Sequence, residues 1–301
     1  MSQKWLRPCS AITGRRNGHE MSLMSMPLDL ASLAPGLEQR DNGLWFACQQ
    51  ARVSYPANGN AACLAVEDRS FWFRHRNRCI ISLVRRFPPD GPFLDIGGGN
   101  GYVAKGLTDA GIACVLVEPG IDGAQAARAR GLEPVICARL EDTGLPSGCI
   151  AAAGMFDVLE HIENDAAALR QLHTLLRPGG RLFLTVPAYP FLASGDDAIA
   201  GHFRRYTLSS LARVLAGSRF RIEFASYMFA PLPPLIFCLR TVPSRLGLHR
   251  GSDPERDAAE HAPAGAAAWL MDRLLAVEYG RIEAGRTLPI GGSCICTAVR
   301  E

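Results

Sequence analysis

The chain has 301 residues, of which 48% are hydrophobic, so it can bury a sizeable core as one large domain or one domain with appendages. A formal net charge of +3 is too small to indicate nucleic acid as a partner, and no apolar run of about eighteen residues predicts a membrane-spanning helix. Ten cysteines are scattered without a C-x-x-C pair, which disfavours a zinc site and favours a reducing, cytoplasmic setting.

Residues 1–40 are expected to form a weakly ordered leader. Basic residues but no acidic residue precede Glu20, a composition that resembles a transit peptide. We favour a polar leader, or a true start at Met21 or Met26, because no apolar region typical of a secretory signal is present.

Residues 41–90 are expected to form a helical lead-in. From Ser70 to Phe87, apolar residues recur at helical spacing among several arginines. The simplest interpretation is an amphipathic helix that caps a sheet and exposes its arginines. In the alternative, the helix is a lid whose Trp72 and Arg76 close over a cofactor or an anionic substrate.

The stretch from Phe93 to Val103 reads F-L-D-I-G-G-G-N-G-Y-V, which predicts a short strand, a tight glycine turn and the start of a helix. Glycines let the backbone approach a ligand closely, and the first N–H groups of the helix face that ligand. This pattern indicates a nucleotide-type cofactor site. A dinucleotide fingerprint would need a glycine where Tyr102 stands, and a phosphate-binding loop would need Ser or Thr after Lys105.

A second apolar strand, residues 112–117, ends at Glu118. An acidic residue in this place can accept two hydrogen bonds from a ribose diol, as in other nucleoside-binding α/β sheets. Because the carboxyl ends of parallel strands meet at one sheet edge, Asp95, the glycines and Glu118 are expected to lie together.

Three motifs carry a family resemblance. The D-x-G-x-G-x-G spacing that begins at Asp95 resembles motif I of class I S-adenosylmethionine (SAM) dependent methyltransferases. The D-V-L-E-H-I run from Asp157 and the L-R-P-G-G-x-L-x-L-x-V-P run that ends at Pro187 are similar to those of the group that includes ubiquinone-pathway O-methyltransferases. The resemblance implies an α/β fold, formed by residues 91–301, with a doubly wound, mostly parallel seven-stranded sheet and an antiparallel last strand.

The resemblance also implies SAM (S-adenosyl-L-methionine) as the cofactor. In this class, the loop after the third strand usually holds an acidic residue that reaches the adenine amino group. That position is Ala138 here, so Glu141 and the backbone of Leu140 are the remaining candidates. The expected cofactor-binding residues are Asp95, Gly97, Gly99, Gly101, Glu118, Leu140, Glu141 and Phe156.

Residues 201–207 read G-H-F-R-R-Y-T and resemble a bacterial methyltransferase subgroup met beside polysaccharide and lipid-linked sugar pathways. Histidine is the side chain best suited to act as a base near neutral pH, so we expect His202 to deprotonate a hydroxyl acceptor. Arg204 or Arg205 would hold an anionic acceptor. His161 is either a packing residue or a contributor to a divalent metal site, and no metal is expected because no further ligand spacing supports one. The candidate catalytic residues are His202, Arg205, Tyr206 and His161.

Residues 228–239 are apolar but contain three prolines, and they are too few to span a bilayer. They are expected to pack in the core, to line a pocket for an apolar acceptor, or to touch a membrane surface. Residues 251–265 are expected to form a mobile loop. A helix over 266–283 and a last strand over 288–299 complete the expected elements.

The resemblance therefore predicts an enzyme that transfers a methyl group from SAM to a hydroxyl oxygen of a small-molecule or lipid- or sugar-linked acceptor. We expect it in the cytoplasm, with a membrane-associated fraction if residues 228–239 touch lipid, and without nucleic acid as a partner. Two alternatives stay open. One is a non-catalytic methyltransferase-like binding protein, which Ala138 and Ala151 at usually acidic positions would suit; the other is a nucleotide-binding oxidoreductase.

Overall fold

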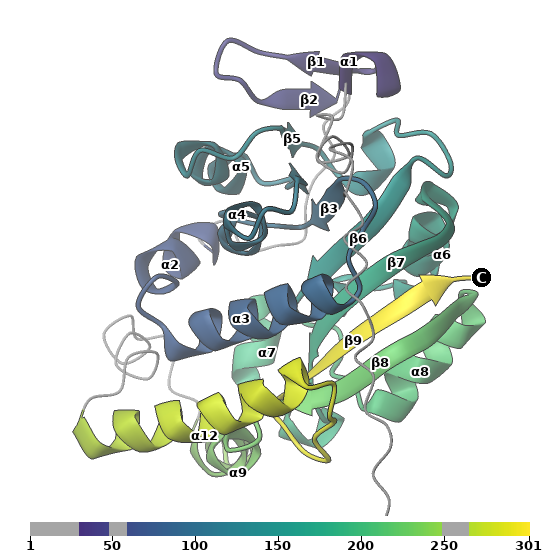
Figure 1. Ribbon diagram of the computed structural model, residues 1–301. Coiled ribbons are helices and arrows are strands. Elements are labelled where there is room, and N and C mark those ends of the chain that lie inside the picture. The colour runs from purple at the N-terminus through teal and green to yellow at the C-terminus, as the bar shows by residue number, and fades with distance from the viewer. Residues whose placement is uncertain (1–29, 48–58, 249–264) are drawn as a thin grey trace, which may run out of the picture.

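The computed structural model of the chain describes residues 30–47, 59–248 and 265–301 (Figure 1). Most of the expected leader and nearly all of the expected mobile loop lie outside these described residues, so both stay predictions. The strands are β1 (Leu37–Gln39), β2 (Trp45–Ala47), β3 (Phe93–Ile96), β4 (Cys114–Val117), β5 (Val135–Cys137), β6 (Ile150–Phe156), β7 (Leu176–Pro187), β8 (Phe220–Met228) and β9 (Ser293–Arg300).

Helices connect the strands and cover both faces of the sheet (Figure 1). The α-helices are α1 (Leu30–Leu33), α2 (Gly59–Val66), α3 (Phe71–Arg86), α4 (Tyr102–Asp109), α5 (Ile121–Ala129), α6 (Asp165–Leu175), α7 (Gly195–Ala200), α8 (Leu208–Gly217), α9 (Leu232–Ile236), α10 (Val242–Arg245) and α12 (Gly265–Glu283). The short 3-10 helices are η1 (Leu140–Asp142), η2 (Leu159–His161) and η3 (Pro190–Leu192), and η4 (Phe237–Thr241) is a short π-helix.

The sheet has the order β1-β2-β5-β4-β3-β6-β7-β9-β8. Strands β5, β4, β3, β6 and β7 are mutually parallel, and β9 lies between β7 and β8, antiparallel to both. The expected doubly wound, mostly parallel sheet with an antiparallel last strand is confirmed.

The sheet has nine strands and not the expected seven, because the hairpin β1–β2 extends it at one edge. Trp45 and Phe46 of β2 pair in parallel with Ile136 and Cys137 of β5. Part of the segment expected as leader and helical lead-in therefore adds to the sheet edge. Each strand of the hairpin has three residues, too few for an alternating pattern to show in the sequence.

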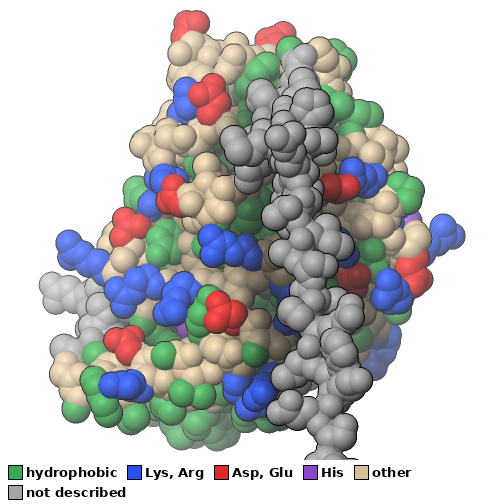
Figure 2. All heavy atoms as spheres, viewed as in Figure 1, with side chains coloured by type: hydrophobic (Ala, Val, Ile, Leu, Met, Phe, Trp, Pro, Cys, Tyr) green, Lys and Arg blue, Asp and Glu red, His purple; other side chains and the backbone are tan. Residues whose placement is uncertain are grey.

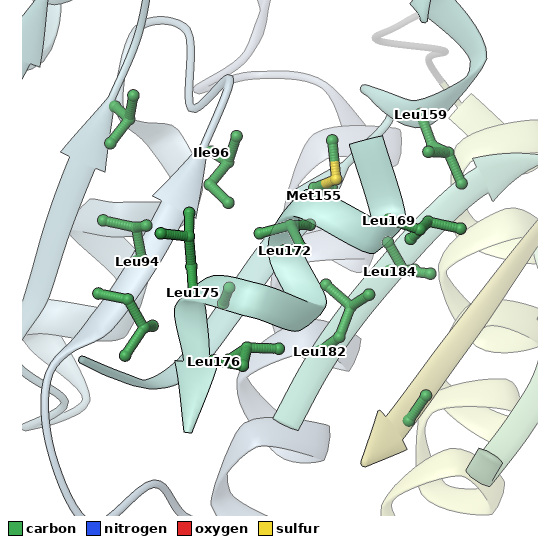
Figure 3. Packing of buried hydrophobic residues seen from close by; sticks show 14 of the residues in the cluster. Leu94, Ile96, Met155, Leu159, Leu169, Leu172, Leu175, Leu176, Leu182 and Leu184 are labelled. Atoms are coloured by element: carbon green, nitrogen blue, oxygen red, sulfur yellow. The ribbon is translucent and has the colours of Figure 1, made fainter. Parts of the chain in front are cut away.

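Two apolar layers pack on the sheet because successive side chains of a strand point to opposite faces. Leu94 and Ile96 of β3 pack with Leu172 of α6, on the face that also receives α8 (Figure 3). Phe93 points the other way and packs with residues of α3, α4, α5 and α12, including Ile80 of α3. The site described below lies beyond the carboxyl ends of the strands between these layers.

Helix α3 begins where its sequence provides a cap. The side chain of Ser70 accepts hydrogen bonds from the backbone N–H groups of Trp72 (3.1 Å) and Phe73 (3.3 Å). Helix α12 packs along α3, and the buried pair of His75 Nε2 and Glu278 Oε1 joins them at 2.8 Å. The segment from Ser70 is thus a helix that packs on the sheet's second face, with Arg76 buried and not exposed.

The apolar segment 228–239 divides between core and surface. Met228 and Phe229 are fully buried, whereas Leu235, Phe237 and Leu239 are exposed. Among the described residues, no helix is both long enough and apolar enough to cross a membrane.

Candidate functional site

A cavity of about 780 Å³ opens at the carboxyl ends of β3, β4 and β6. Its wall includes most of the residues that the sequence singled out, from segments far apart in the chain. Those lining it are Asp95, Gly97, Gly99, Glu118, Leu140, Glu141, Phe156, His161 and His202. Gly101, Arg205 and Tyr206 do not line it.

The turn between β3 and α4 needs glycine for two reasons. Gly97, Gly99 and Gly101 have positive φ angles of 66°, 53° and 77°, a region that side chains rarely adopt. A Cβ at Gly97 would also lie 2.8 Å from a methyl carbon of Val158, and one at Gly101 would clash with Leu132. Gly97 and Gly99 therefore let the backbone line the cavity. Gly101 does not line it, and its lack of a side chain instead leaves room for Leu132 and Ala127 at the start of α4.

Glu118 stands at the end of β4 with its carboxylate held in place. Its two oxygens accept hydrogen bonds from the backbone N–H groups of Gly99 (2.9 Å) and Gly120 (2.7 Å). Burial raises the pKa of Glu118, and these two N–H groups, with the side chain of Asn60, oppose that rise. A carboxylate has about four acceptor positions, so it retains capacity for a ribose hydroxyl.

Asp95 lies at the end of β3 and is 1% exposed. Its Oδ2 accepts no hydrogen bond from any residue that the structure describes. Burial raises the pKa of Asp95 to about 7, although the cationic Arg76 and the backbone of Ala104 act in the opposite direction. An acceptor atom without a donor beside a cavity suits a ligand that carries a positive charge or an N–H group.

Leu140 and Glu141 follow β5 in η1, and both line the cavity as the adenine contact would require. The carboxylate of Glu141 pairs with Arg139 at 3.1 Å and is half exposed. Phe156, at the end of β6, is buried, and its ring stacks parallel to that of Phe93 with centroids 6.2 Å apart.

Arg76 reaches the cavity from α3. Its guanidinium forms an ion pair with Asp157, which directly follows β6 and has a positive φ of 57°. It also lies over the ring of Trp72, 4.5 Å from the centroid, and the Trp72 ring stacks on Phe229. One interpretation of the sequence made Arg76 a lid residue, but its partner Asp157 was not identified, because 81 residues separate the two.

The loop after β7 orients His202. The side chain Nδ1 of His202 lies 2.9 Å from Oδ1 of Asp197. Burial raises the pKa of Asp197, but hydrogen bonds from His202 and Arg205 outweigh burial and hold that pKa well below its usual range. An ionised carboxylate only accepts hydrogen bonds, so Nδ1 carries the proton and Nε2 is left as the basic nitrogen.

Asp197 is itself fixed by two groups. The guanidinium of Arg205 binds it with Nε at 2.7 Å and Nη2 at 3.1 Å, and the backbone N–H of Ser194 donates to its Oδ2 at 2.9 Å. Ser194 and Asp197 form the capping box of α7. Sequence reasoning missed Asp197, although the S-x-x-D spacing of such a box was a usable signal.

The expectation that Arg204 or Arg205 holds an acceptor directly needs correction. Arg205 is engaged with Asp197, and Arg204 forms an ion pair with Asp165 at 2.9 Å. The hydroxyl of Tyr206 also donates to Asp165 at 2.8 Å, and its ring is buried. These three residues therefore hold the loop in place behind the cavity.

Glu160, His161 and His202 form a cluster in which ligand-type atoms lie within 4.8 Å of one another. The rings of His161 and His202 meet edge to face with centroids 4.7 Å apart. Glu160 is fully buried, and burial with the nearby Asp157 raises its pKa well above the ordinary value. Burial and His202 lower the pKa of His161 to about 4. The three could hold a metal ion, a grouping that the local spacing around His161 did not reveal because His202 lies 41 residues further on.

The comparisons with known proteins agree with this geometry. A family described as a methyltransferase domain matches residues 72–223, about half of the chain. The chain belongs to this methyltransferase family. The narrower subgroup that the motifs indicated stays a prediction.

Two curated relatives and one solved structure illustrate the likeness. A probable S-adenosylmethionine-dependent methyltransferase of Mycolicibacterium smegmatis is 24% identical over 173 residues, covering 56% of this chain and 66% of that protein. A ubiquinone biosynthesis O-methyltransferase of Pseudomonas aeruginosa is 28% identical over 117 residues, covering 35% of this chain and 50% of that protein. The chain thus spans between half and two thirds of the length of these relatives.

The solved structure is phosphoethanolamine N-methyltransferase 2 of Haemonchus contortus, in complex with S-adenosyl-L-methionine. It matches with a TM-score of 0.52 at 16% identity, covering 83% of this chain and 58% of that one. At this identity, the likeness shows the shared fold alone.

The cavity fits the cofactor named for these relatives. The glycine turn allows close approach of an aminoacyl group, Glu118 has acceptor capacity for a ribose, and the unpaired Oδ2 of Asp95 suits a cationic ligand. Leu140 and Phe156 add apolar side chains to the cavity wall.

Proposed function

We propose that the protein binds SAM and transfers its methyl group to a hydroxyl oxygen of a small-molecule or lipid- or sugar-linked acceptor. The observation that carries the proposal is the position of His202. Oriented by Asp197, it lines the same cavity as the glycine turn and Glu118. A base and a cofactor site that share one cavity are what methyl transfer to a hydroxyl requires.

When bound, SAM supplies a methyl group on an electrophilic sulfonium. The chain's own residues would supply position and charge: Glu118 would hold the ribose, the turn from Gly97 would lie against the aminoacyl end, and Asp95 would lie near the positive charge. The ion pair of Arg76 and Asp157 lies in the cavity wall beside them. Holding the two reactants in line contributes much of the rate of such a transfer.

His202 removes the acceptor proton at Nε2 while Nδ1 donates to Asp197. Arg205 acts through Asp197 and is a positioning residue. His161, whose pKa of about 4 keeps it neutral near pH 7, places no cation beside the proton that His202 receives. This arrangement of a base and an orienting carboxylate supports His202, and not Arg205 or Tyr206, as the group that touches the acceptor.

We call the part of the cavity beside His202 its acceptor end. Apolar Ile162, Ala168 and the half-exposed Phe203 line it together with polar Glu163, Asn164 and Gln171, and the two arginines of the loop are engaged elsewhere. This lining supports a hydroxyl acceptor with an apolar portion, and a lipid-linked compound is one such class. Contact of residues 228–239 with a membrane also stays a proposal and is developed in the next section.

The test compares His202→Ala with His173→Ala, a matched change at a histidine of α6 that does not line the cavity. Calorimetry measures binding of SAM and of its demethylated product, and mass spectrometry follows isotope-labelled methyl from SAM into lipid and polar extracts. We expect His202→Ala to bind SAM as the parent does and to transfer methyl groups at least about a hundredfold more slowly, the usual size of the loss of a general base. His173→Ala should match the parent in both measurements.

The same measurements address the two alternatives. SAM binding by the parent without a labelled product in either extract would favour the non-catalytic binding protein. Binding of a nicotinamide cofactor in place of SAM would favour the oxidoreductase, against which the family match already counts. Equal transfer rates in His202→Ala and the parent would remove His202 from the mechanism.

A further inference from the structure

We propose that the end of the molecule formed by α9, η4, α10 and the outer stripe of α12 docks on an anionic lipid bilayer. Figure 2 shows apolar side chains gathered along this end, over α12 and α9, with Arg side chains among them. We call this surface the docking face. Its docking is a binding property that stands apart from methyl transfer.

The first half of the docking face is the continuous segment 232–248. Leu239, Leu246 and Leu248 are each more than 60% exposed, and Leu235 and Phe237 are also exposed. Large apolar side chains at this exposure are unusual when they follow one another along a short segment. The segment contains two arginines and no acidic residue.

The second half is the outer stripe of α12. Leu270, Leu274 and Val277 recur at spacings of four and three residues, so they lie on one side of the helix, and all three are exposed. The buried stripe, Leu275 with Ile282, lies on another side and packs toward α3. The helix therefore has an inner apolar stripe that the core uses and an outer one that no described residue covers.

The two halves are joined rigidly. The buried carboxylate of Glu278 on α12 accepts hydrogen bonds from the backbone N–H groups of Phe229 and Ala230, just before α9. Leu232 of α9 and Met271 of α12 belong to one apolar cluster. A rigid face loses little conformational entropy when it docks.

The charges on the docking face select an anionic bilayer as the occupant. Arg240 and Arg245 lie in the first half, where Arg240 is also 3.7 Å from the exposed carboxylate of Asp196. Arg273 and Arg281 fall on the outer side of α12, whereas Asp272 and Glu283 fall away from the stripe, so arginines still outnumber acidic residues on the face. The exposed ring of Trp269, under the guanidinium of Arg273, adds the amphipathic side chain that favours a membrane interface.

A second copy of the chain fits these charges less well. A two-fold interface brings the same patch of each copy together, so the arginines of one copy would face those of the other. Lipid headgroups of negative charge meet the same arginines with attraction.

The docking face also borders the acceptor end of the cavity. Thr241 donates to the carbonyl of Leu192 at 2.9 Å, and the backbone N–H of Gly195 donates to Ser244 at 2.9 Å. The helix that begins at Gly195 carries Asp197, which orients His202. If the proposed function holds, docking would bring the acceptor end close to lipid-linked compounds.

The test is sedimentation of the full chain with vesicles, without SAM or any acceptor. The probes are vesicles of phosphatidylcholine alone and vesicles of equimolar phosphatidylcholine and phosphatidylglycerol. We expect binding to the anionic vesicles at low salt, weakened by high salt. Leu239→Glu with Leu246→Glu should lower the bound-to-free ratio at least about tenfold, because two apolar side chains no longer enter the interface. Arg240→Gln with Arg245→Gln should lower it by roughly fivefold for each arginine.

Ile121→Glu is the matched control, since Ile121 is an exposed apolar residue of α5 at the opposite end of the molecule (Figure 1). It should bind vesicles as the parent does.

Absence of vesicle binding at low salt would overturn the proposal, and so would equal binding by the parent and the Leu239→Glu with Leu246→Glu variant. Sedimentation velocity tests whether two copies of the chain associate through this face. A parent that does not bind vesicles and is a dimer, with a monomeric Leu239→Glu and Leu246→Glu variant, would show that the docking face is a contact between copies. Circular dichroism of each variant confirms that it is folded, and because no activity is measured, failure here leaves the proposed methyl transfer untouched.

Discussion

The two ends of the cavity are built in different ways. The cofactor end comes from two short stretches, each a strand followed by a turn, and it depends on backbone conformation: positive φ angles at Gly97 and Gly99 and N–H groups that hold Glu118. The acceptor end is held by side chains, with Arg205 on Asp197 and Asp197 on His202. A site built from backbone groups can be recognised in one short stretch of sequence, whereas a site built from long side chains that contact one another across the fold cannot.

The largest expected effect concerns Asp95, the buried carboxyl of the cofactor end. Its pKa of about 7 in the folded chain, against an ordinary 3.8, means that the native state holds the proton more tightly, so stability without cofactor is lost as pH rises from about 4 to about 7. Ionisation of Asp95 in the folded chain costs about 4 kcal/mol of stability when it is complete. Asp95→Asn removes it, so the free energy of unfolding of the variant minus that of the parent should grow by roughly 2–3 kcal/mol between pH 5 and pH 8.

Urea unfolding of the two proteins at both pH values measures this difference. Thr174→Ser, which changes no titratable group and lies at an exposed position of α6, is the control and should show a difference that does not change with pH. If the difference in the free energy of unfolding between Asp95→Asn and the parent also did not change with pH, ionisation of this buried carboxyl would cost no stability. The cofactor end would then lose the electrostatic feature that most distinguishes it from the acceptor end.

The next effect concerns binding at the cofactor end. Glu118→Ala removes the acceptor for a ribose diol and should weaken SAM binding by about 2 kcal/mol, or roughly thirtyfold. Glu141→Ala changes a half-exposed acid on the neighbouring loop and should have a smaller effect. Calorimetry measures both, and unchanged SAM affinity in a folded Glu118→Ala protein would contradict the assignment of the ribose site.

The smallest effect belongs to the acceptor end. Arg204→Gln breaks a partly exposed ion pair with Asp165, for which we expect a loss of about 0.5–1 kcal/mol in the free energy of unfolding. SAM affinity should not change, because Arg204 lies outside the cofactor end. A large loss of SAM affinity in this variant would show that the two ends are coupled and would break the comparison.

The same contrast explains what could be predicted from the sequence. The strand, turn and helix from Phe93 to Val103 and the antiparallel last strand were both predicted, because the first depends on local pattern and the second on family resemblance. The hairpin β1–β2 was not, since its strands are too short for a periodic signal.

The acceptor end could be predicted only in part. His202 was identified from its motif, but its partner Asp197 was not, and Arg205 was given the role of an anion-binding residue that its contact with Asp197 does not support. The ion pair of Arg76 with Asp157 has no local signal in the sequence, because only the folded chain brings α3 to the end of β6. Residues that act through distant partners become visible only when the fold is known.

The position of β9 has a consequence for how the protein is made. β8 stands at the sheet edge and pairs with β9, which in turn separates it from β7. During synthesis, residues 220–228 leave the ribosome long before residues 293–300, so β8 must wait for the strand that attaches it to the sheet. Pairing between segments so distant in sequence is slow to form. Of the described strands, the last to be synthesised is therefore the one that completes the sheet. A ribosome that stops short of it releases a chain in which the edge of β7 is exposed and β8 is unpaired, and such strands are prone to aggregation.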